Sequence, residues 1–336
     1  MSGPSVAIFG LGRIGSTYDA GQSSPTPRSH VGAALKAGWQ IAALADSSVE
    51  ARQAAKRQWP ALAHLVVAPQ ECEGITADVV AVCTPPADRL GDVERALQLK
   101  PRLLILEKPL ALDLQTAVDI VTRCNAAGVS LRVNFHRRFD TGHQRFRALS
   151  GGEPRMAILK YGKGLFNYGS HMVDLLTDWF GPTDAVQALM PIARPVVDAV
   201  ADDPMLSFRC AMRSGFEALV LAVEGVDFDQ FDAEFLFADK VIELSNGGVE
   251  RRVLIPIADL YYQGYTHLQE AADLTEVSEV SGLVGLYGAA HAHLSDGAGM
   301  PGCTGEAAAT GIAVLQAVLR SRDAGGAVEP VRIAFG

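Results

Sequence analysis

A lysine follows an apolar run near the middle of the chain, where Leu104–Leu106 gives way to Glu107, Lys108 and Pro109. A continuous run of Leu and Ile bounded in this way is typical of an interior strand of a parallel sheet. Ligands of open α/β sheets bind at the carboxyl ends of the strands, so we expect Lys108 to leave the core beside a ligand. A surface lysine at a strand end is the alternative when this stretch is considered by itself.

A glycine-rich motif lies close to the start of the chain. Residues 6–9 are a short apolar strand, and Gly10, Gly12 and Gly15 follow it as GxGxxG. Such glycines permit a tight turn, a close approach of the backbone to a pyrophosphate and close helix–strand packing. We expect the phosphates at a helix amino terminus, where free N–H groups favour an anion. The motif is weak alone, but it directly follows a strand, as dinucleotide binding requires.

An acid ends the next predicted strand, residues 40–45, at Asp46. A carboxylate there can bind the ribose 2′-hydroxyl of NAD and would repel the 2′-phosphate of NADP, so we expect NAD. The distance from Gly15 exceeds the usual spacing of about 20 residues. We place the excess in residues 17–29, which have the composition of a loop. His30 then either simply starts a helix or belongs to a loop that covers the cofactor or substrate.

The order of predicted elements indicates two domains. Strands and helices alternate as far as Phe135, a pattern that is typical of a doubly wound parallel sheet. Residues 206–255 instead show apolar residues in alternation, with a hairpin signal at Asn246-Gly247-Gly248. We therefore predict an α/β chain, with an NAD-binding Rossmann domain at 1–135. An α+β domain with a largely antiparallel open sheet follows at 136–336, for substrate binding and oligomerisation.

Composition excludes several classes of protein. The chain has 336 residues and a net charge of −9, with a pI near 5.4, which argues against nucleic-acid binding. Five scattered cysteines without a CxxC argue against a disulfide framework or a zinc site, and we expect no metal. No signal-type leader and no apolar run of membrane-spanning length is seen, so we expect a cytoplasmic protein without a membrane partner.

The motifs in order are GLGRIG, Asp46, CTPPADR, EKP, NFHRRF and GSHMVDL. Together they resemble the glucose–fructose oxidoreductase, inositol dehydrogenase and rhizopine-catabolism (Gfo/Idh/MocA) family over nearly the whole chain. The resemblance implies a Rossmann domain followed by an α/β domain whose open sheet commonly buries a subunit interface. It also implies a homodimer or homotetramer, a tightly held nicotinamide cofactor, and a small polyhydroxylated substrate such as a sugar, cyclitol or nucleotide sugar.

The resemblance also assigns residues. It implies Lys108 and His171 as catalytic residues, and it places Asn167 where the family usually has an aspartate. We assign substrate contacts to Arg137, Asp174 and Tyr168, although ordinary packing or helix capping are alternatives for them. The expected cofactor-binding set comprises Gly10, Gly12, Arg13, Ile14, Gly15, Asp46, Thr84, Pro85, Glu107 and Lys108.

The implied reaction is hydride transfer between the nicotinamide and a secondary alcohol, with the hydroxyl proton passing to a nearby base. His171 titrates near neutrality, and Lys108 can polarise the reacting oxygen. Asn167 supplies no charge to the histidine, so turnover is less certain than cofactor binding. Two alternatives follow: an NAD-dependent glycosidase or lyase of the same fold, and a non-catalytic NAD-binding regulator.

Overall fold

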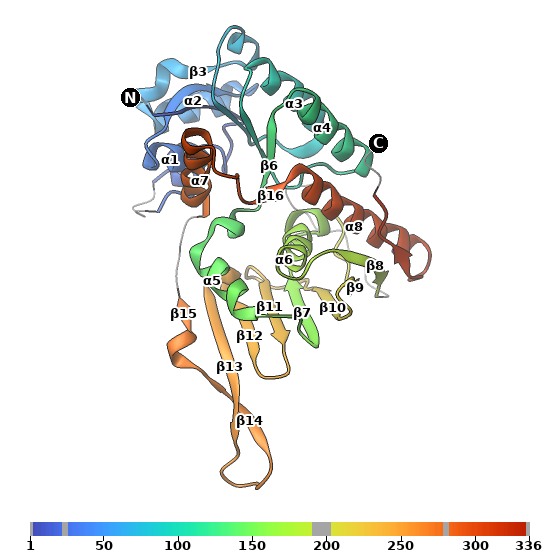
Figure 1. Ribbon diagram of the computed structural model, residues 1–336. Coiled ribbons are helices and arrows are strands. Elements are labelled where there is room, and N and C mark those ends of the chain that lie inside the picture. The colour runs from blue at the N-terminus through green and yellow to red at the C-terminus, as the bar shows by residue number, and fades with distance from the viewer. Residues whose placement is uncertain (1–2, 22–25, 190–202, 278–281, 334–336) are drawn as a thin grey trace. The chain divides into compact units, whose positions relative to one another are not determined.

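The computed structural model describes residues 3–21, 26–189, 203–277 and 282–333 (Figure 1). The chain divides into two compact units. The first comprises residues 1–140 and 280–309, and the second comprises residues 141–279 and 310–336. The assignment of cofactor and substrate binding to 1–135 and 136–336 stays a prediction.

Sheet A, in the first unit, has seven strands in the order β16-β6-β5-β4-β1-β2-β3. The pairs from β6 to β3 are parallel, and β16 is antiparallel to β6. Every residue of β5 is buried, as its continuous apolar sequence predicts for an interior parallel strand. The strands are β1 (Ser5–Phe9), β2 (Gln40–Ala45), β3 (Val66–Val67), β4 (Val79–Val82), β5 (Leu103–Glu107), β6 (Ser130–Asn134) and β16 (Cys303–Thr304).

Three α-helices of the first unit begin at side-chain caps. Ser29, Ser48 and Asp113 each accept a hydrogen bond from a backbone N–H in the first turn of α1, α2 and α4. The α-helices are α1 (His30–Lys36), α2 (Val49–Gln58), α3 (Arg89–Gln98), α4 (Leu114–Ala126) and α7 (Gly282–Asp296). The 3-10 helices are η1 (Thr17–Asp19), η2 (Pro60–Leu65), η3 (Pro69–Cys72), η4 (Pro86–Asp88) and η5 (His136–Phe139).

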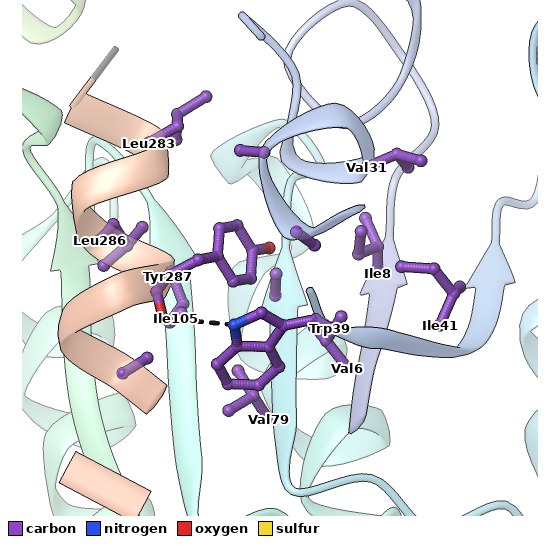
Figure 2. Packing of buried hydrophobic residues seen from close by; sticks show 14 of the residues in the cluster. Val6, Ile8, Val31, Trp39, Ile41, Val79, Ile105, Leu283, Leu286 and Tyr287 are labelled. Carbon is purple, nitrogen blue, oxygen red and sulfur yellow. Dashed lines mark hydrogen bonds between the residues drawn. The ribbon is translucent and has the colours of Figure 1, made fainter. Parts of the chain in front are cut away.

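Helix α7 comes from late in the chain and completes the core of the first unit. Figure 2 shows Leu283, Leu286 and Tyr287 of this helix facing residues of sheet A and Trp39. The Trp39 indole N–H donates to the backbone carbonyl of Tyr287 at 3.2 Å, and the two rings meet edge to face at 5.4 Å. A segment from residue 282 onward therefore covers the sheet that the first third of the chain begins.

Sheet B, in the second unit, has ten strands along the order β14-β13-β12-β11-β7-β10-β9-β8-β17, with β15 beside β13. All of its pairs are antiparallel except β7 with β10. Alternate residues of β7, β9 and β11 are buried, as their period-two sequences predict. The strands are β7 (Met156–Tyr161), β8 (Thr183–Ala188), β9 (Phe208–Met212), β10 (Glu217–Ala222), β11 (Phe231–Leu236), β12 (Val241–Ser245), β13 (Glu250–Ala258), β14 (Thr266–Glu270), β15 (Glu276–Val277) and β17 (Glu329–Pro330).

Aromatic side chains join the helices of the second unit to sheet B. Trp179 and Phe180 of α6 lie 5.0 and 5.1 Å from the Phe235 ring of β11, and His143 of α5 meets Trp179 edge to face. The helical elements are α5 (Thr141–Ser150), the π-helix η6 (Leu165–Gly169), α6 (Ser170–Phe180), η7 (Asn246–Gly248) and η8 (Ala272–Leu274). Helix α8 (Gly305–Asp323) begins in the first unit and continues through the second.

The predicted fold class is confirmed: a Rossmann-like parallel sheet and a second, largely antiparallel sheet. The hairpin signal at 246–248 does connect the antiparallel pair β12 and β13. Sequence reading did not predict α5, β8 or β14. Strand β14 is exposed at every position, so it lacks the apolar alternation that marks a strand. In the part of the chain that is described, no helix is both long and apolar enough to cross a membrane.

The core of the first unit generates a stability prediction. Trp39 is 3 % exposed, and we expect Trp39→Ala to lower the free energy of unfolding by roughly 3–5 kcal/mol, since a large buried ring is replaced by a cavity. Urea denaturation followed by circular dichroism measures the change. Val49→Ala, at a half-exposed site in the same unit, is the control and should cost less than about 1 kcal/mol. Equal losses would contradict the packing role of Trp39.

Candidate functional site

The glycine-rich turn requires glycine at two of its three motif positions. Gly10 has φ +90°, and a Cβ there would lie 2.6 Å from the backbone nitrogen of Thr84. A Cβ on Gly15 would overlap the carbonyl oxygen of Gly10. At Gly12, by contrast, a Cβ would meet no described atom within 4 Å, and its φ is not in the left-handed region. Protein packing therefore does not require glycine at position 12, whereas close approach of a ligand to the backbone would require it.

The helix after this turn is interrupted. Ser16 and Tyr18 donate backbone hydrogen bonds to the carbonyls of Gly12 and Arg13, which makes a helical turn after the glycines. The inserted segment follows this turn, and α1 then starts at His30, whose N–H donates to the carbonyl of Ile14 at 2.9 Å. The helix expected at the motif is thus one turn at 12–16, and α1 continues beyond an insertion. The predicted loop at 17–29 contains η1, and residues 22–25 lie outside the described part.

Asp46 ties the glycine-rich turn to the end of β2. Its Oδ2 accepts the N–H of Leu11 at 2.6 Å, and its Oδ1 accepts the N–H of Ser48 at 2.8 Å. These bonds orient the carboxylate, and each oxygen keeps a second lone pair that can accept a ribose hydroxyl. Arg52 donates to the backbone carbonyls of Asp46 and Ser47 and holds the same corner from α2.

Thr84 and Pro85 follow β4, beside the glycine-rich turn. The Thr84 hydroxyl donates to Asp92 of α3, and Arg95 donates to the same carboxylate at 2.6 Å. The side chain of Thr84 is therefore held by the helix that follows it. The predicted cofactor residues Gly10, Asp46 and Thr84 lie at the carboxyl ends of the neighbouring strands β1, β2 and β4, as the topology requires.

Glu107 ends β5 inside a buried polar network. Its Oε1 accepts the Nε2–H of His30 at 2.9 Å and the amide of Asn134 at 2.5 Å. The other ring nitrogen of His30 donates to the hydroxyl of Tyr287 at 3.0 Å. The network therefore joins β5, β6, α1 and α7 directly behind Lys108, whose peptide bond to Pro109 is cis.

The charges of this network follow from its contacts. Burial disfavours the imidazolium of His30, but the neighbouring Cys83, Tyr287 and Glu107 outweigh burial and raise its pKa well above the usual value. Burial likewise opposes the Glu107 carboxylate, but His30, Asn134 and Lys108 outweigh it and lower its pKa. We therefore regard His30 and Glu107 as a buried ion pair near neutral pH.

A second histidine near Glu107 has the opposite charge state. His136, in η5, has its pKa lowered to about 3 by burial and by Arg137, with a smaller opposing effect from Glu107. It is therefore neutral at physiological pH, when His30 is charged. The positive charge of Lys108 lowers the pKa of both His136 and Glu107. The charges of Lys108, Arg137 and Glu107 therefore all influence His136 at the carboxyl ends of β5 and β6.

In the second unit, Asn167 lies in the π-helix η6, immediately before α6. The buried carboxylate of Asp203 accepts the N–H groups of Phe166 and Asn167, both at 2.9 Å. A Cβ on Gly164 would overlap this carboxylate, so glycine is required there. Asp203 thus fixes the backbone of the segment that carries Asn167. Single π turns inside helical segments are frequent at functional sites.

His171 is in the first turn of α6 and is buried. Its ring meets Tyr168 and Phe231 edge to face, with centroids 6.3 and 6.1 Å apart. Lys163 lies over the Tyr168 ring at 5.2 Å and pairs with Asp229. Asp174, one turn further along α6, is partly exposed. The aromatic contacts fix the plane of the imidazole.

The predicted residues form two groups, one in each unit. Glycines 10, 12 and 15, together with Arg13, Ile14, Asp46, Thr84, Pro85, Glu107, Lys108 and Arg137, belong to the first unit, and Asn167, Tyr168, His171 and Asp174 belong to the second. The sequence analysis missed the roles of His30, Asn134, Tyr287 and Asp203. Among these four residues, only His30 had a signal in the sequence, which was its position directly after the inserted segment. That position was interpreted as a helix start or as part of a covering loop.

Residues 5–135 match the sequence model described as "Oxidoreductase family, NAD-binding Rossmann fold" (GFO_IDH_MocA). This match covers the glycine-rich turn, Asp46, Thr84 and the EKP motif. Residues 5–135 are therefore similar in sequence to the NAD-binding Rossmann domain of the Gfo/Idh/MocA oxidoreductase family. None of the curated proteins compared with the chain matches it.

Solved structures of similar fold span both units. UDP-N-acetylglucosamine 3-dehydrogenase GnnA from Acidithiobacillus ferrooxidans is 18 % identical, with a TM-score of 0.72 over 96 % of this chain and 98 % of that one. The WlbA dehydrogenase from Bordetella pertussis, in complex with NADH and UDP-GlcNAcA, is 16 % identical, with a TM-score of 0.73 over 99 % and 100 %. A super-repressor mutant of Gal80p from Saccharomyces cerevisiae is 15 % identical, with a TM-score of 0.75 over 98 % of each chain. At these identities the similarity shows the fold.

The first unit has groups that would hold a nicotinamide cofactor. Gly12 offers bare backbone at a helical turn, Asp46 offers an oriented carboxylate, and Lys108 lies at the end of β5. Asn134 adds a buried side-chain oxygen that has no hydrogen-bond partner among the described residues, an acceptor for a ligand donor. Within the same described part, no cluster of three or more His, Cys, Asp or Glu could hold a metal ion.

The His30–Glu107 pair makes stability depend on pH. Because the pKa of His30 is raised on folding, its contribution is complete below about pH 6.5 and is lost as the pH rises through the folded value. Because the pKa of Glu107 is lowered, its contribution is complete above about pH 4.3 and is lost as the pH falls through the folded value.

We expect His30→Leu to lower the free energy of unfolding by about 3–5 kcal/mol at pH 6, because it leaves a buried carboxylate without its partner. The gap to wild type should narrow as the pH is raised. Urea titrations from pH 5 to pH 9 measure it, with His64→Leu, outside the network, as the control. A gap that stays constant with pH would show that the pair is not ionised.

Gly12 provides a test of the cofactor site. Gly12→Ala meets open space and no left-handed φ, so it should fold as wild type, yet its methyl group would hold a pyrophosphate away from the backbone. We expect about tenfold or greater loss of NAD affinity, equivalent to at least ~1.4 kcal/mol, with an unchanged melting temperature. Calorimetric titration measures the affinity. Unchanged NAD affinity would show that the phosphates do not approach this turn.

Proposed function

We propose that this protein transfers a hydride between NAD and a secondary alcohol of a sugar, cyclitol or nucleotide sugar. The observation that carries the proposal is the convergence of Gly12, Asp46, Thr84 and Lys108 at one edge of sheet A, in a chain segment that matches the model of an NAD-binding oxidoreductase family. The two nucleotide-sugar dehydrogenases of similar fold support the choice of substrate class.

In this proposal His171 and Lys108 are the catalytic residues. Nicotinamide, when bound, supplies the acceptor for the hydride that leaves the carbinol carbon. The hydroxyl proton passes to the imidazole of His171, whose plane is fixed by Tyr168 and Phe231. The ammonium of Lys108 polarises the same oxygen, and Glu107, held by His30 behind it, keeps the local field favourable to a cation.

Asn167 distinguishes this site from the family pattern. An aspartate at this position would raise the pKa of the histidine, whereas an amide can only orient the ring or bind substrate. Asp203 fixes the backbone of Asn167 at 2.9 Å, so the amide starts from a defined position. We assign substrate contacts to Tyr168 and Asp174, and a substrate hydroxyl or phosphate to Arg137.

The cofactor preference rests on Asp46. Its carboxylate is fixed at the end of β2 by two backbone N–H groups, where it would accept the ribose 2′-hydroxyl and repel a 2′-phosphate. Arg52 lies at the same corner, but its guanidinium donates to backbone carbonyls. We therefore propose NAD rather than NADP.

A non-catalytic NAD-binding regulator is the second candidate. The uncharged Asn167 favours it, since an amide at this position supplies no charge to the histidine. The fold similarity to Gal80p, named as a super-repressor mutant, supports a regulator on this fold. The two candidates differ in a single measurable property, because a regulator binds NAD without converting any substrate.

A substrate screen tests the proposal. Nucleotide sugars, free sugars and cyclitols are incubated with protein and NAD, and both reduced nicotinamide and product mass are followed. We expect a product two mass units lighter together with NADH. His171→Ala should lower kcat by about 10²- to 10⁴-fold without weakening NAD binding.

Three outcomes would contradict the proposal. NAD binding without turnover on the panel would favour the regulator. A cleaved or eliminated product without net NADH would favour the glycosidase or lyase reading. Wild-type turnover by His171→Ala would remove that residue from the proton transfer, and an unchanged basic limb of the pH–rate profile in Asn167→Asp would show that Asn167 does not act on the histidine.

A further inference from the structure

A cavity of about 450 Å³ lies at one end of sheet B, within the second unit. It is lined by the end of α5, the segment that leads into β7, the turn between β9 and β10 and the turn between β11 and β12. Small-molecule sites in proteins have volumes of roughly 300–1,000 Å³. The cavity is therefore large enough to hold a small metabolite.

The cavity is at the opposite end of sheet B from His171. The ring of His171 packs against Phe231, the first residue of β11, whereas Phe237 in the cavity wall directly follows the last residue of this strand. Six positions along an extended strand correspond to about 20 Å. The cavity is thus separate from the residues that the second unit contributes to the candidate substrate site.

Strand alternation places an aromatic ring and two cations in one row of the cavity wall. Phe235 of β11 is paired with one residue of β7 and one residue of β12, and these three face the same side of the sheet. Two positions further along the three strands, and therefore on the same side, are Phe237, Arg155 and Lys240, which all line the cavity. Neighbouring strands lie about 4.8 Å apart, so the two cations flank the ring.

Within the described part of the chain, neither cation has a hydrogen-bonded carboxylate partner. The side chain of Lys240 is 21 % exposed, and its Nζ lies 5.0 Å from the centre of the Phe237 ring and 3.9 Å from a carboxylate oxygen of Asp239. Arg155 donates its backbone N–H to the carbonyl of Leu236 at 2.6 Å, but its guanidinium makes no ion pair with the residues described. Both side chains can therefore donate charge-assisted hydrogen bonds to a bound anion.

Two carboxylates, Glu153 and Asp239, also line the cavity. The side chain of Asp239 is 77 % exposed and Glu153 is exposed as well, so water and salt screen their charges. Lys240 is much less exposed, and its charge is screened less. The field inside the cavity therefore favours an anion over a cation.

Ser214, in the turn between β9 and β10, adds a hydroxyl to the wall. Its Oγ is buried and has no hydrogen-bond partner among the residues that the structure describes. Buried hydroxyl groups are normally hydrogen-bonded, because an unmade bond costs free energy. A ligand acceptor in the cavity would provide the missing partner.

The walls of the cavity are held in place by the protein itself. The N–H of Phe237 donates to the carbonyl of Lys240 at 2.8 Å and closes the turn between β11 and β12. In the other turn, the carbonyl of Phe216 accepts the N–H of Met212 at 3.0 Å, and the Phe216 ring meets Phe180 edge to face at 5.3 Å. A preformed site loses less entropy when its ligand binds.

We propose that this cavity binds a small organic anion, with its carboxylate or phosphate at Lys240 and Arg155 and its apolar part against the ring of Phe237. Ser214 donates its hydroxyl to the same ligand. The site is a second one, at the other end of sheet B from His171, so the proposal does not rest on the hydride transfer proposed above.

The first test measures which compounds bind. Full-length protein, in a buffer free of phosphate and carboxylates, is titrated by calorimetry with benzoate, phenyl phosphate and the neutral benzyl alcohol. We expect at least one of the two anions to bind at millimolar concentration or below, and benzyl alcohol to bind at least about tenfold more weakly. Preference for benzoate or for phenyl phosphate identifies the anionic group. No binding of either anion, or equal binding of benzyl alcohol, overturns the proposal.

The second test locates the bound anion. Lys240→Gln and Arg155→Gln should each weaken its binding about tenfold or more, with unchanged circular dichroism and NAD affinity. Lys160→Gln removes the same charge from an exposed position on β7 outside the cavity, and it should change the affinity less than about twofold. Equal affinities in all three variants would place the anion elsewhere and overturn the proposal.

The third test separates a ligand-binding hydroxyl from a structural one. Ser214→Ala should leave the melting temperature of the free protein unchanged, since no hydrogen bond is lost, and should weaken anion binding roughly three- to tenfold. Ser207→Ala is the control, because the Ser207 hydroxyl accepts the N–H of Ala222 at 3.0 Å. It should lower the melting temperature and leave anion binding unchanged. Wild-type affinity in Ser214→Ala would overturn the assignment of this hydroxyl to the ligand.

Discussion

The buried pair of His30 and Glu107 is the interaction on which the first unit depends. Taking two charges out of water costs several kcal/mol for each ion, and the cost is offset only when geometry and further hydrogen bonds are good. Here Asn134 and Tyr287 supply those bonds. As a result, β5, β6, α1 and α7 hold one another in a single arrangement, and Lys108 starts from the end of a strand that cannot shift.

Patterns in the sequence were enough to predict the sheets but not their completion. The continuous apolar run before Glu107 reflects a strand that is buried on both faces, and the alternation in β7, β9 and β11 reflects burial on one face. Both patterns can be read from residue type, because buried positions favour apolar side chains. The return of α7 to the first unit is a long-range contact that no local periodicity records. Strand β14 could not be predicted because all of its residues are exposed, so its sequence shows no apolar alternation.

The candidate site divides in the same way. Gly10, Gly12, Asp46 and Lys108 follow strands of a recognisable order, so their place at one edge could be deduced from topology. His30 could not be, because its partner Glu107 is 77 positions away and the intervening helices and strands decide whether they meet. The role of Asp203 was also missed. Its carboxylate accepts the backbone N–H groups of residues 166 and 167, and every residue type except proline has such a group, so the sequence gives no signal for the contact.

The late arrival of α7 has a consequence for synthesis. The strands β1 to β6 leave the ribosome first, but Tyr287, which closes their core and bonds to His30 and Trp39, follows about 150 residues later. Until then one face of the nascent sheet stays uncovered. The unit that begins the chain is therefore among the last to be completed, and a fragment ending near residue 135 would carry the family's sequence motifs without the helix that seals them.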